Sequence, residues 1–176
     1  ACSAGTYQGS TGQTSCDDAD AGHYVSTAGQ ISQTACAAGT YQPSTGQASC
    51  NDAGVGFYVD ATASTSQTAC AAGTYQPSTG QTSCDTADAG YYVSMTAQSS
   101  QTACAAGTYQ PSTGQTSCDD ADAGHYVDST ASTSQTACAG GSYQPSTGQT
   151  SCDDADAGHY VDSTASTSQT ACAAGT

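Results

Sequence analysis

The chain contains no lysine and no arginine, and this absence excludes several classes of function. Its 15 acidic residues are all aspartates, and they give a formal net charge of -15. Proteins that bind DNA, RNA or anionic membranes place cationic side chains against phosphate groups. The sequence therefore excludes nucleic acids and anionic membrane surfaces as partners.

Large apolar side chains are also scarce. Leucine and tryptophan are absent, and the 176 residues include one phenylalanine, one methionine, one isoleucine and six valines. A chain of this length would ordinarily form one globular domain, but it lacks the apolar volume for such a core. No segment is long and apolar enough to span a bilayer, and the N-terminal residues do not resemble a signal peptide. We expect no transmembrane segment in these residues.

Cysteine, in contrast, is abundant. Low hydrophobicity and high net charge are typical of disordered chains, yet 11 cysteines in 176 residues indicate a disulfide scaffold instead. Disulfides at this density persist in oxidising compartments. The sequence therefore predicts an extracellular or cell-surface protein.

A tandem repeat organises the whole sequence. Cysteine spacings alternate between 14 and 20 residues, which gives a period of 34, and the tyrosines from Tyr7 to Tyr160 and the glycines from Gly5 to Gly175 recur at half of that period. Two variants of a 17-residue unit alternate, one with two cysteines and one with none. The predicted repeats are residues 1–35, 36–69, 70–103, 104–137 and 138–171, with residues 172–176 beginning a sixth. Because neither end carries an atypical capping repeat, we expect this to be a window of a longer array.

The two variants also predict the disulfide pairing. The cysteine-free unit replaces both cysteines together, so that Ala19 and Gln33 stand where Cys2 and Cys16 stand. Joint loss is expected of a bonded pair, since bonds between neighbouring units would leave single cysteines without partners. The predicted pairs are Cys2 with Cys16, Cys36 with Cys50, Cys70 with Cys84, Cys104 with Cys118, and Cys138 with Cys152. Cys172 is left over, and we expect its partner to lie beyond Thr176.

The local sequence predicts short β-structure and no helices. Each unit offers a G-x-Y strand start, and four units continue into Gln-Pro-Ser-Thr-Gly, a turn sequence with proline and glycine at positions of restricted φ. No window shows apolar residues at a helical period. The expected fold is small, disulfide-rich and mostly irregular or β, an elongated tandem-repeat rod of 17-residue units paired into 34-residue repeats without a globular core.

The segment Cys36-Ala-Ala-Gly39-Thr-Tyr41, with Cys50 fourteen residues after Cys36, resembles the cysteine-rich repeats of ephrin-receptor and tumour-necrosis-factor-receptor type. Their modules begin C-x-x-G-x-Y and bond their first two cysteines, which agrees with the pairing above. This chain departs from them in lacking a C-x-x-C, because Ala19 stands where the second cysteine would follow Cys16. The resemblance implies a shared scaffold and carries no ligand specificity.

Serine and threonine number 25 and 28, close to a third of the chain, which is the composition of an O-glycosylated stalk. The one asparagine, Asn51, is not in an N-glycosylation sequence. The threonine candidates for O-glycosylation are Thr11, Thr45, Thr62, Thr79, Thr96, Thr113, Thr130, Thr147 and Thr164. The serine candidates are Ser15, Ser32, Ser49, Ser66, Ser83, Ser100, Ser117, Ser134, Ser151 and Ser168. The prolines Pro43, Pro77, Pro111 and Pro145 could be hydroxylated and then glycosylated.

Aspartate clusters are weaker candidates for calcium binding. They are Asp17, Asp18 and Asp20, then Asp119, Asp120 and Asp122, and then Asp153, Asp154 and Asp156, each set before a glycine. Carboxylates beside a glycine turn are elements of calcium loops, but residues 51–56 (Asn-Asp-Ala-Gly-Val-Gly) do not preserve the set, and no EF-hand is formed. A solvated acidic face is the favoured interpretation. We expect no dedicated metal site and no cofactor other than covalent glycans.

Histidine offers no catalytic pattern. His23, His125 and His159 share one repeat position, which Phe57 and Tyr91 fill elsewhere, so a half-packed ring is expected there. Serine, histidine and aspartate occur in repeated copies without a unique arrangement of the kind that catalysis requires. The sequence therefore predicts that the chain is not an enzyme.

The leading functional prediction is a structural extracellular fibre or stalk that is disulfide-stapled, O-glycosylated and self-associating, as in a surface appendage or glycofibril. The alternative is the repeat stalk of an adhesin or receptor ectodomain that presents a binding head. A third candidate is an ice-binding repeat protein, although the threonines do not recur as a short T-x-T motif.

Overall fold

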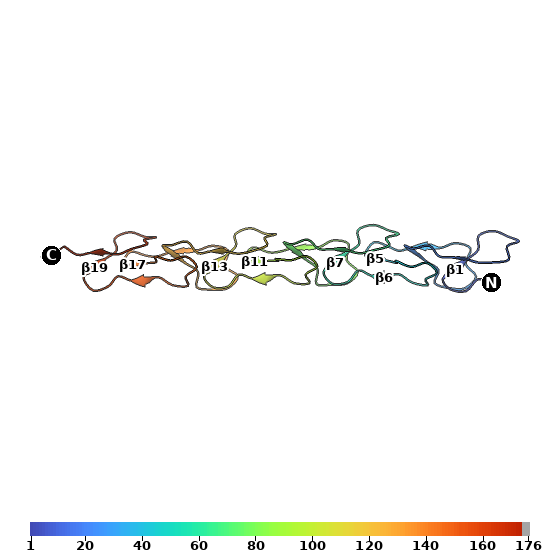
Figure 1. Ribbon diagram of the computed structural model, residues 1–176, viewed down its shortest axis with the longest axis horizontal. Helices are drawn as coiled ribbons and strands as arrows, with labels where there is room; N and C mark the ends of the chain where they lie inside the picture. The colour runs from blue at the N-terminus through green and yellow to red at the C-terminus, as the bar shows by residue number, and fades with distance from the viewer. Residues whose placement is uncertain (174–176) are drawn as a thin grey trace. The chain divides into compact units, whose positions relative to one another are not determined.

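A computed structural model describes residues 1–173 and shows a succession of short β-hairpins (Figure 1). No helix occurs in these residues, and every strand is two residues long. Such short two-stranded hairpins are marginal on their own in water. Their order must therefore come from covalent links and from contacts with neighbouring hairpins.

The strands follow the 17-residue period. The first strands of the hairpins are β1 (Thr6–Tyr7), β3 (His23–Tyr24), β5 (Thr40–Tyr41), β7 (Phe57–Tyr58), β9 (Thr74–Tyr75), β11 (Tyr91–Tyr92), β13 (Thr108–Tyr109), β15 (His125–Tyr126), β17 (Ser142–Tyr143) and β19 (His159–Tyr160). The second strands are β2 (Asp17–Asp18), β4 (Thr34–Ala35), β6 (Asn51–Asp52), β8 (Thr68–Ala69), β10 (Asp85–Thr86), β12 (Thr102–Ala103), β14 (Asp119–Asp120), β16 (Thr136–Ala137), β18 (Asp153–Asp154) and β20 (Thr170–Ala171).

The hairpins are antiparallel and share one register. Tyr7 in β1 lies opposite Asp17 in β2, and Tyr24 in β3 lies opposite Thr34 in β4. Equivalent pairs occur in β5–β6, β7–β8, β11–β12, β13–β14, β15–β16, β17–β18 and β19–β20. Threonine and aromatic residues favour such extended backbone. The predicted class, a disulfide-rich β and irregular repeat without helices, is confirmed.

A glycine turn leads into each hairpin. Before β3, the His23 N–H donates to the Asp20 carbonyl at 3.0 Å, and Gly22 between them has a φ of +80°. This is the signature of a type II turn, which needs a positive φ at its third residue. The G-x-Y pattern of the sequence is therefore a turn glycine followed by a strand.

Backbone hydrogen bonds join each hairpin to the next one in the chain. The Gly22 N–H donates to the Gln42 carbonyl at 2.8 Å, and the Val25 N–H donates to the Gln47 carbonyl at 3.0 Å. The first of these bonds recurs from Gly5 to Val25, Gly39 to Val59, Gly56 to Gln76, Gly90 to Gln110, Gly107 to Val127, Gly124 to Gln144 and Gly141 to Val161. The backbone groups left free by the short strands are satisfied in this way.

The buried side chains recur at two positions of the repeat. One position alternates alanine and cysteine: Ala19, Cys36, Ala53 and Cys70, then Ala87, Cys104, Ala121 and Cys138. A second position alternates valine and glutamine: Val25, Gln42, Val59 and Gln76, then Val93, Gln110, Val127 and Gln144. Each hairpin therefore buries few atoms of its own, as the sequence predicts for a chain without a globular core.

The chain divides into two compact units, which are described separately. The first comprises Ala1–Asp85 and Met95–Ser100, and the second comprises Thr86–Ser94 and the residues from Gln101 onward. Residues 95–100 belong to the first unit because the Ala97 N–H donates to the Cys70 carbonyl at 2.9 Å and the Gln76 N–H donates to the Gln98 carbonyl at 3.0 Å. A loop thus packs back onto hairpins that precede it.

Candidate functional site

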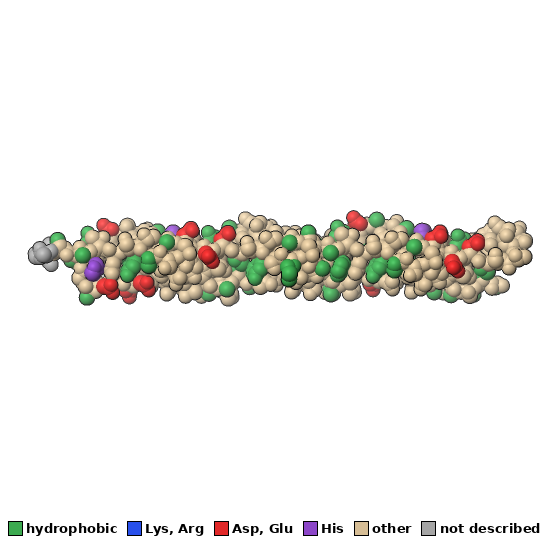
Figure 2. Space-filling view, in the orientation of Figure 1, with side chains coloured by type: hydrophobic (Ala, Val, Ile, Leu, Met, Phe, Trp, Pro, Cys, Tyr) green, Lys and Arg blue, Asp and Glu red, His purple; other side chains and the backbone are tan. Residues whose placement is uncertain are grey.

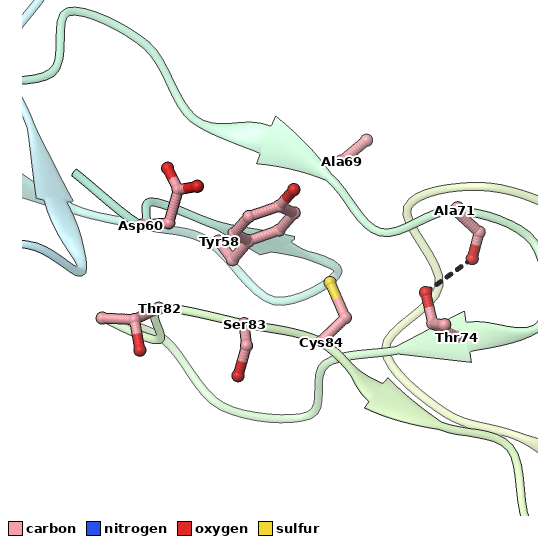
Figure 3. Close-up of a pocket in the computed structure, with 8 residues that line it drawn as sticks. All are labelled: Tyr58, Asp60, Ala69, Ala71, Thr74, Thr82, Ser83 and Cys84. Carbon is pink, nitrogen blue, oxygen red and sulfur yellow. Dashed lines mark hydrogen bonds between the residues drawn. The ribbon is translucent and has the colours of Figure 1, made fainter.

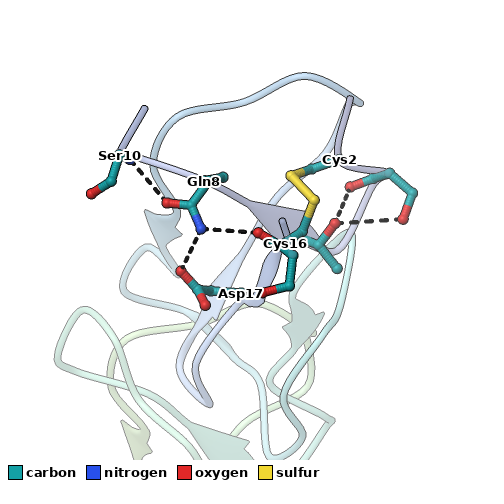
Figure 4. Close-up of a disulfide and its surroundings, with 8 residues drawn as sticks. Cys2, Gln8, Ser10, Cys16 and Asp17 are labelled. Carbon is teal, nitrogen blue, oxygen red and sulfur yellow. Dashed lines mark hydrogen bonds between the residues drawn. A yellow bond between two sulfur atoms is a disulfide. The ribbon is translucent and has the colours of Figure 1, made fainter. Parts of the chain in front are cut away.

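Five disulfides close the cysteine-containing hairpins. They join Cys2 to Cys16, Cys36 to Cys50, Cys70 to Cys84, Cys104 to Cys118, and Cys138 to Cys152, which are the pairs that the sequence predicts. The paired Cα atoms lie 5.7–5.8 Å apart, a usual separation for a disulfide. The first cysteine of each pair is buried and the second is partly or fully exposed. Figure 4 shows the first of these bonds beside the loop that it closes.

The cysteine-free hairpins are closed by a glutamine instead. In the first of them the Gln33 Oε1 atom accepts a hydrogen bond from the Asp20 N–H, and the Gln33 Nε2 atom donates to the Asp20 carboxylate, both at 2.6 Å. We call this paired contact the Gln–Asp clasp. It recurs with Gln101 and Asp88, Gln135 and Asp122, and Gln169 and Asp156.

One cysteine-free hairpin has only half of the Gln–Asp clasp, because it lacks the hydrogen bond to a carboxylate. Gln67 bonds only to the backbone N–H of Gly54, at 2.7 Å, because glycine replaces the aspartate there. Sequence reasoning identified Gln33 as the residue replacing Cys16 but did not assign it a role. The signal was present, since an aspartate directly follows the alanine that replaces the first cysteine in four of the five cysteine-free units.

In the cysteine-containing hairpins another glutamine fixes the loop. Gln42 is 5% exposed, its Nε2 atom donates to the Ser49 carbonyl at 2.8 Å, and its Oε1 atom accepts from the Ser44 N–H at 3.1 Å. Gln8 makes the corresponding contacts in the first copy and also donates to the Asp17 carboxylate at 3.3 Å (Figure 4). These bonds hold the backbone of the loop that contains Pro43.

The hydroxyl groups fall into two classes. Thr40 donates to the Ala37 carbonyl at 2.8 Å, and Thr6, Thr74, Thr108 and Ser142 make the equivalent bond. None of the predicted threonine or serine glycosylation candidates uses its hydroxyl in this way, and every one of them is exposed. The four loop prolines are also exposed. The candidates are accessible to a modifying enzyme without unfolding.

The aspartates proposed for calcium do not converge. Asp17 and Asp18 lie exposed on β2, while Asp20 is bound in the Gln–Asp clasp. Within residues 1–173 no three histidine, cysteine or acidic side chains lie close enough together to hold a metal ion. Figure 2 shows acidic side chains scattered over the visible face, which agrees with a diffuse acidic surface.

The histidines stand on separate strands. His23 is half-buried on β3, and its Nδ1 atom lies 3.3 Å from the Ala21 carbonyl. His125 on β15 has the same surroundings, with 3.4 Å to the Ala123 carbonyl. His159 on β19 is exposed. The rings of His23 and His125 thus contact their own turns rather than a second catalytic side chain.

Cys172 is exposed and forms no disulfide within the described residues. The prediction of a partner for Cys172 is not tested by these residues and stays a prediction. Residues 1–173 include no helix with the length and hydrophobicity that a membrane crossing requires.

Hairpins closed alternately by a disulfide and by a glutamine side chain, and joined by recurring backbone hydrogen bonds, define a cysteine-rich tandem-repeat protein. Residues 22–70 and 90–138, together more than half of the chain, match the tyrosine-protein kinase ephrin type A/B receptor-like family. The chain therefore belongs to the ephrin receptor-like family, as the C-x-x-G-x-Y motif predicts. No curated protein matches the sequence.

Proposed function

We propose that this chain is a structural segment of an extracellular fibre or stalk and that it carries O-linked glycans. The observation that carries the proposal is the repetition of one contact set. A recurring set of backbone hydrogen bonds runs from a hairpin to its successor within both units, so the copies have similar surroundings. An array of this kind propagates by nearest-neighbour contacts and adds length without creating a unique site.

The exposed hydroxyls support the glycan part of the proposal. The candidate serines and threonines, including Thr45 and Ser83, are exposed and keep their hydroxyls clear of the internal bonds to turn carbonyls. In the modification, the hydroxyl oxygen bonds to the anomeric carbon of a phosphate-activated sugar. The bond from that carbon to the phosphate oxygen breaks, and the hydroxyl proton passes to a base of the transferase. A glycan coat would shield an otherwise exposed backbone.

Absence of catalysis is part of the same proposal. The separate positions of His23, His125 and His159 support it, because general acid–base chemistry needs partners within hydrogen-bonding reach. No cofactor is proposed. The scattered carboxylates support diffuse binding of counterions, and calcium would belong to that population.

Two measurements on native, non-reduced material test the proposal. Mass spectrometry of proteolytic fragments that map to these 176 residues should give masses above those of the unmodified peptides, in steps of single sugars. Electron microscopy of the same material should show filaments built from the repeat. Fragment masses equal to those of the unmodified peptides would contradict the glycan coat. A defined head on a short array would instead favour the adhesin or receptor stalk, which the membership of the ephrin receptor-like family makes the second candidate.

A further inference from the structure

Three hollows that share a tyrosine, two alanines, a serine and a cysteine in their linings recur in the two units. They lie beside Tyr24, Tyr58 and Tyr126, and their volumes are about 470, 410 and 600 Å³. We call them the Tyr grooves. The first two belong to the first unit and the third to the second unit. Their volumes fall within the range of small-molecule sites, and their recurrence shows that they are products of the repeat rather than accidents of one loop.

Each Tyr groove has the same walls. A half-buried tyrosine ring from a cysteine-free hairpin forms one wall, and a serine followed by the second cysteine of a disulfide forms the other: Ser49 and Cys50, Ser83 and Cys84, and Ser151 and Cys152. In Figure 3, Tyr58 lies at the centre of the second groove, with Ser83 and Cys84 on the segment along one edge.

These walls fit a neutral sugar. The tyrosine offers an aromatic surface on which the C–H face of a pyranose can stack. The hydroxyls of the rim, together with Asp60 in the second groove and Asp128 in the third, offer partners for sugar hydroxyls. Because the chain has no lysine or arginine, a phosphate, sulfate or acidic sugar would find no counter-charge. The grooves therefore disfavour anionic ligands and accommodate uncharged polyhydroxyl ligands.

The rim serine supplies a tether for such a sugar. Ser83 is exposed, and its contact with Gln76 uses the Ser83 backbone carbonyl rather than the hydroxyl. Figure 3 shows that hydroxyl turned away from the Tyr58 ring, and rotation about the Cα–Cβ bond can redirect it. A sugar attached at this position remains next to the ring, and its effective concentration in the groove is high.

We propose that the first sugar of an O-linked glycan on Ser49, Ser83 or Ser151 packs against the tyrosine ring of its own Tyr groove. This inference rests on the proposed function, because it requires that the chain be glycosylated. It goes further by naming three attachment sites and by giving the grooves an occupant. The packed sugar would cover the exposed part of the ring.

The test uses the full chain secreted by a host that attaches O-glycans. Glycopeptide mapping first establishes which serines carry sugar. Hydroxyl-radical footprinting then measures the reactivity of each tyrosine in the wild-type chain and in Ser83→Ala. Tyr58 should become severalfold more reactive in the variant, while Tyr24 and Tyr126 remain unchanged as internal controls. Ser83→Thr, which keeps an acceptor hydroxyl, should restore protection.

A matched control is Ser66→Ala. Ser66 occupies the same repeat position in a cysteine-free unit and lines none of the three Tyr grooves. It should leave the reactivity of all three tyrosines unchanged. If Ser83 carries a sugar and Tyr58 is equally reactive in the wild-type chain and in Ser83→Ala, the proposed packing is wrong. A free saccharide that occupied the groove without attachment to Ser83 would also give equal reactivity, and it too would contradict the proposal.

The remaining outcomes separate this inference from the proposed function. Glycans found on other residues but absent from Ser49, Ser83 and Ser151 would overturn the inference and leave the glycosylated fibre intact. A chain without any glycan would overturn both.

Discussion

At the scale of single residues, the turn glycines are the most constrained positions. A Cβ atom added to Gly22 would lie 2.2 Å from the Ala63 carbonyl oxygen, and the φ of Gly22 is +80°. Gly29 has almost the same φ, +78°, but a Cβ atom there would meet nothing within 4 Å. This pair of glycines separates the cost of a backbone conformation from the cost of a steric clash.

We therefore predict different losses of stability for two alanine substitutions. Gly29→Ala should lower the free energy of unfolding by only about 0.5 kcal/mol, because the cost of placing a side chain in left-handed backbone is partly offset by the lower chain entropy of alanine in the unfolded state. Gly22→Ala should cost several kcal/mol more, because the hairpins must move apart to make room. Urea unfolding of both variants would measure this. Equal losses would show that the contact with Ala63 is unimportant.

Four alanines already occupy such left-handed backbone. Ala63, Ala97, Ala131 and Ala165 have φ values between 55° and 58° at a repeat position where other copies have glycine. Ala131→Gly should raise the free energy of unfolding by about 0.5 kcal/mol, since relief of the conformational cost exceeds the added chain entropy of glycine. The same change at Ala137 on β16, where the backbone is extended, should instead lower it. Thermal unfolding midpoints of the two variants would decide.

At the scale of the hairpin, the Gln–Asp clasp replaces a covalent bond with two hydrogen bonds. The Gln101 Oε1 atom accepts from the Asp88 N–H and the Gln101 Nε2 atom donates to the Asp88 carboxylate, each at 2.7 Å. Gln101→Ala should cost about 1–3 kcal/mol, because one bond is charge-assisted. Gln81→Ala is the control, since Gln81 is exposed and its side chain bonds to the nearby Thr79 carbonyl. Hydrogen exchange of the β11–β12 amides should be faster in Gln101→Ala than in Gln81→Ala. Equal exchange rates in the two variants would contradict a stabilising role for the clasp.

The disulfide and the Gln–Asp clasp occupy equivalent repeat positions, and this equivalence predicts that one can replace the other. Ala121 is fully buried at the repeat position of Cys104, and Gln135 stands at the position of Cys118. The double variant Ala121→Cys with Gln135→Cys should form a sixth disulfide and gain up to about 3 kcal/mol, the chain-entropy value for a loop of this size.

Non-reducing peptide mapping would identify the new bond, and urea unfolding would measure its effect. Gln135→Cys alone is the control, because it removes the clasp and leaves a free thiol. A double variant with two free thiols would show that the cysteine-free hairpin has a different geometry.

Sequence reasoning reached the hairpin scale well because the repeat multiplies each signal. The joint loss of the residues at Cys2 and Cys16 was enough to predict the pairing, and the G-x-Y series placed the strands. It missed the Gln–Asp clasp and the Tyr grooves for a physical reason. Both depend on side chains well separated in the sequence that approach only after the hairpins fold. Periodicity identifies equivalent positions but does not say which positions touch.

At the scale of the whole chain, stability is distributed over the array. Each disulfide is expected to contribute about 3 kcal/mol by restricting the unfolded chain, and the five of them act in separate repeats. Reduction should therefore destabilise every repeat, including the cysteine-free hairpins that hydrogen-bond to their neighbours.

Limited proteolysis before and after reduction would test this expectation, with cleavage expected throughout the reduced chain. Alkylation of Cys172 without reduction is the control and should leave the fragments unchanged, because that thiol is exposed and outside the five disulfides. A reduced chain that resisted proteolysis would show that the backbone bonds and clasps suffice on their own.

The recurring hydrogen bonds also bear on inheritance. A donor in one hairpin finds its acceptor in whichever copy comes next along the chain, and the copies supply nearly the same backbone. Recombination that removes or duplicates one complete repeat therefore leaves every remaining contact with a suitable partner, whereas a change of half a repeat would place two hairpins of the same kind side by side. A gene of this type can gain or lose complete repeats over generations, and the contacts between the remaining hairpins stay the same.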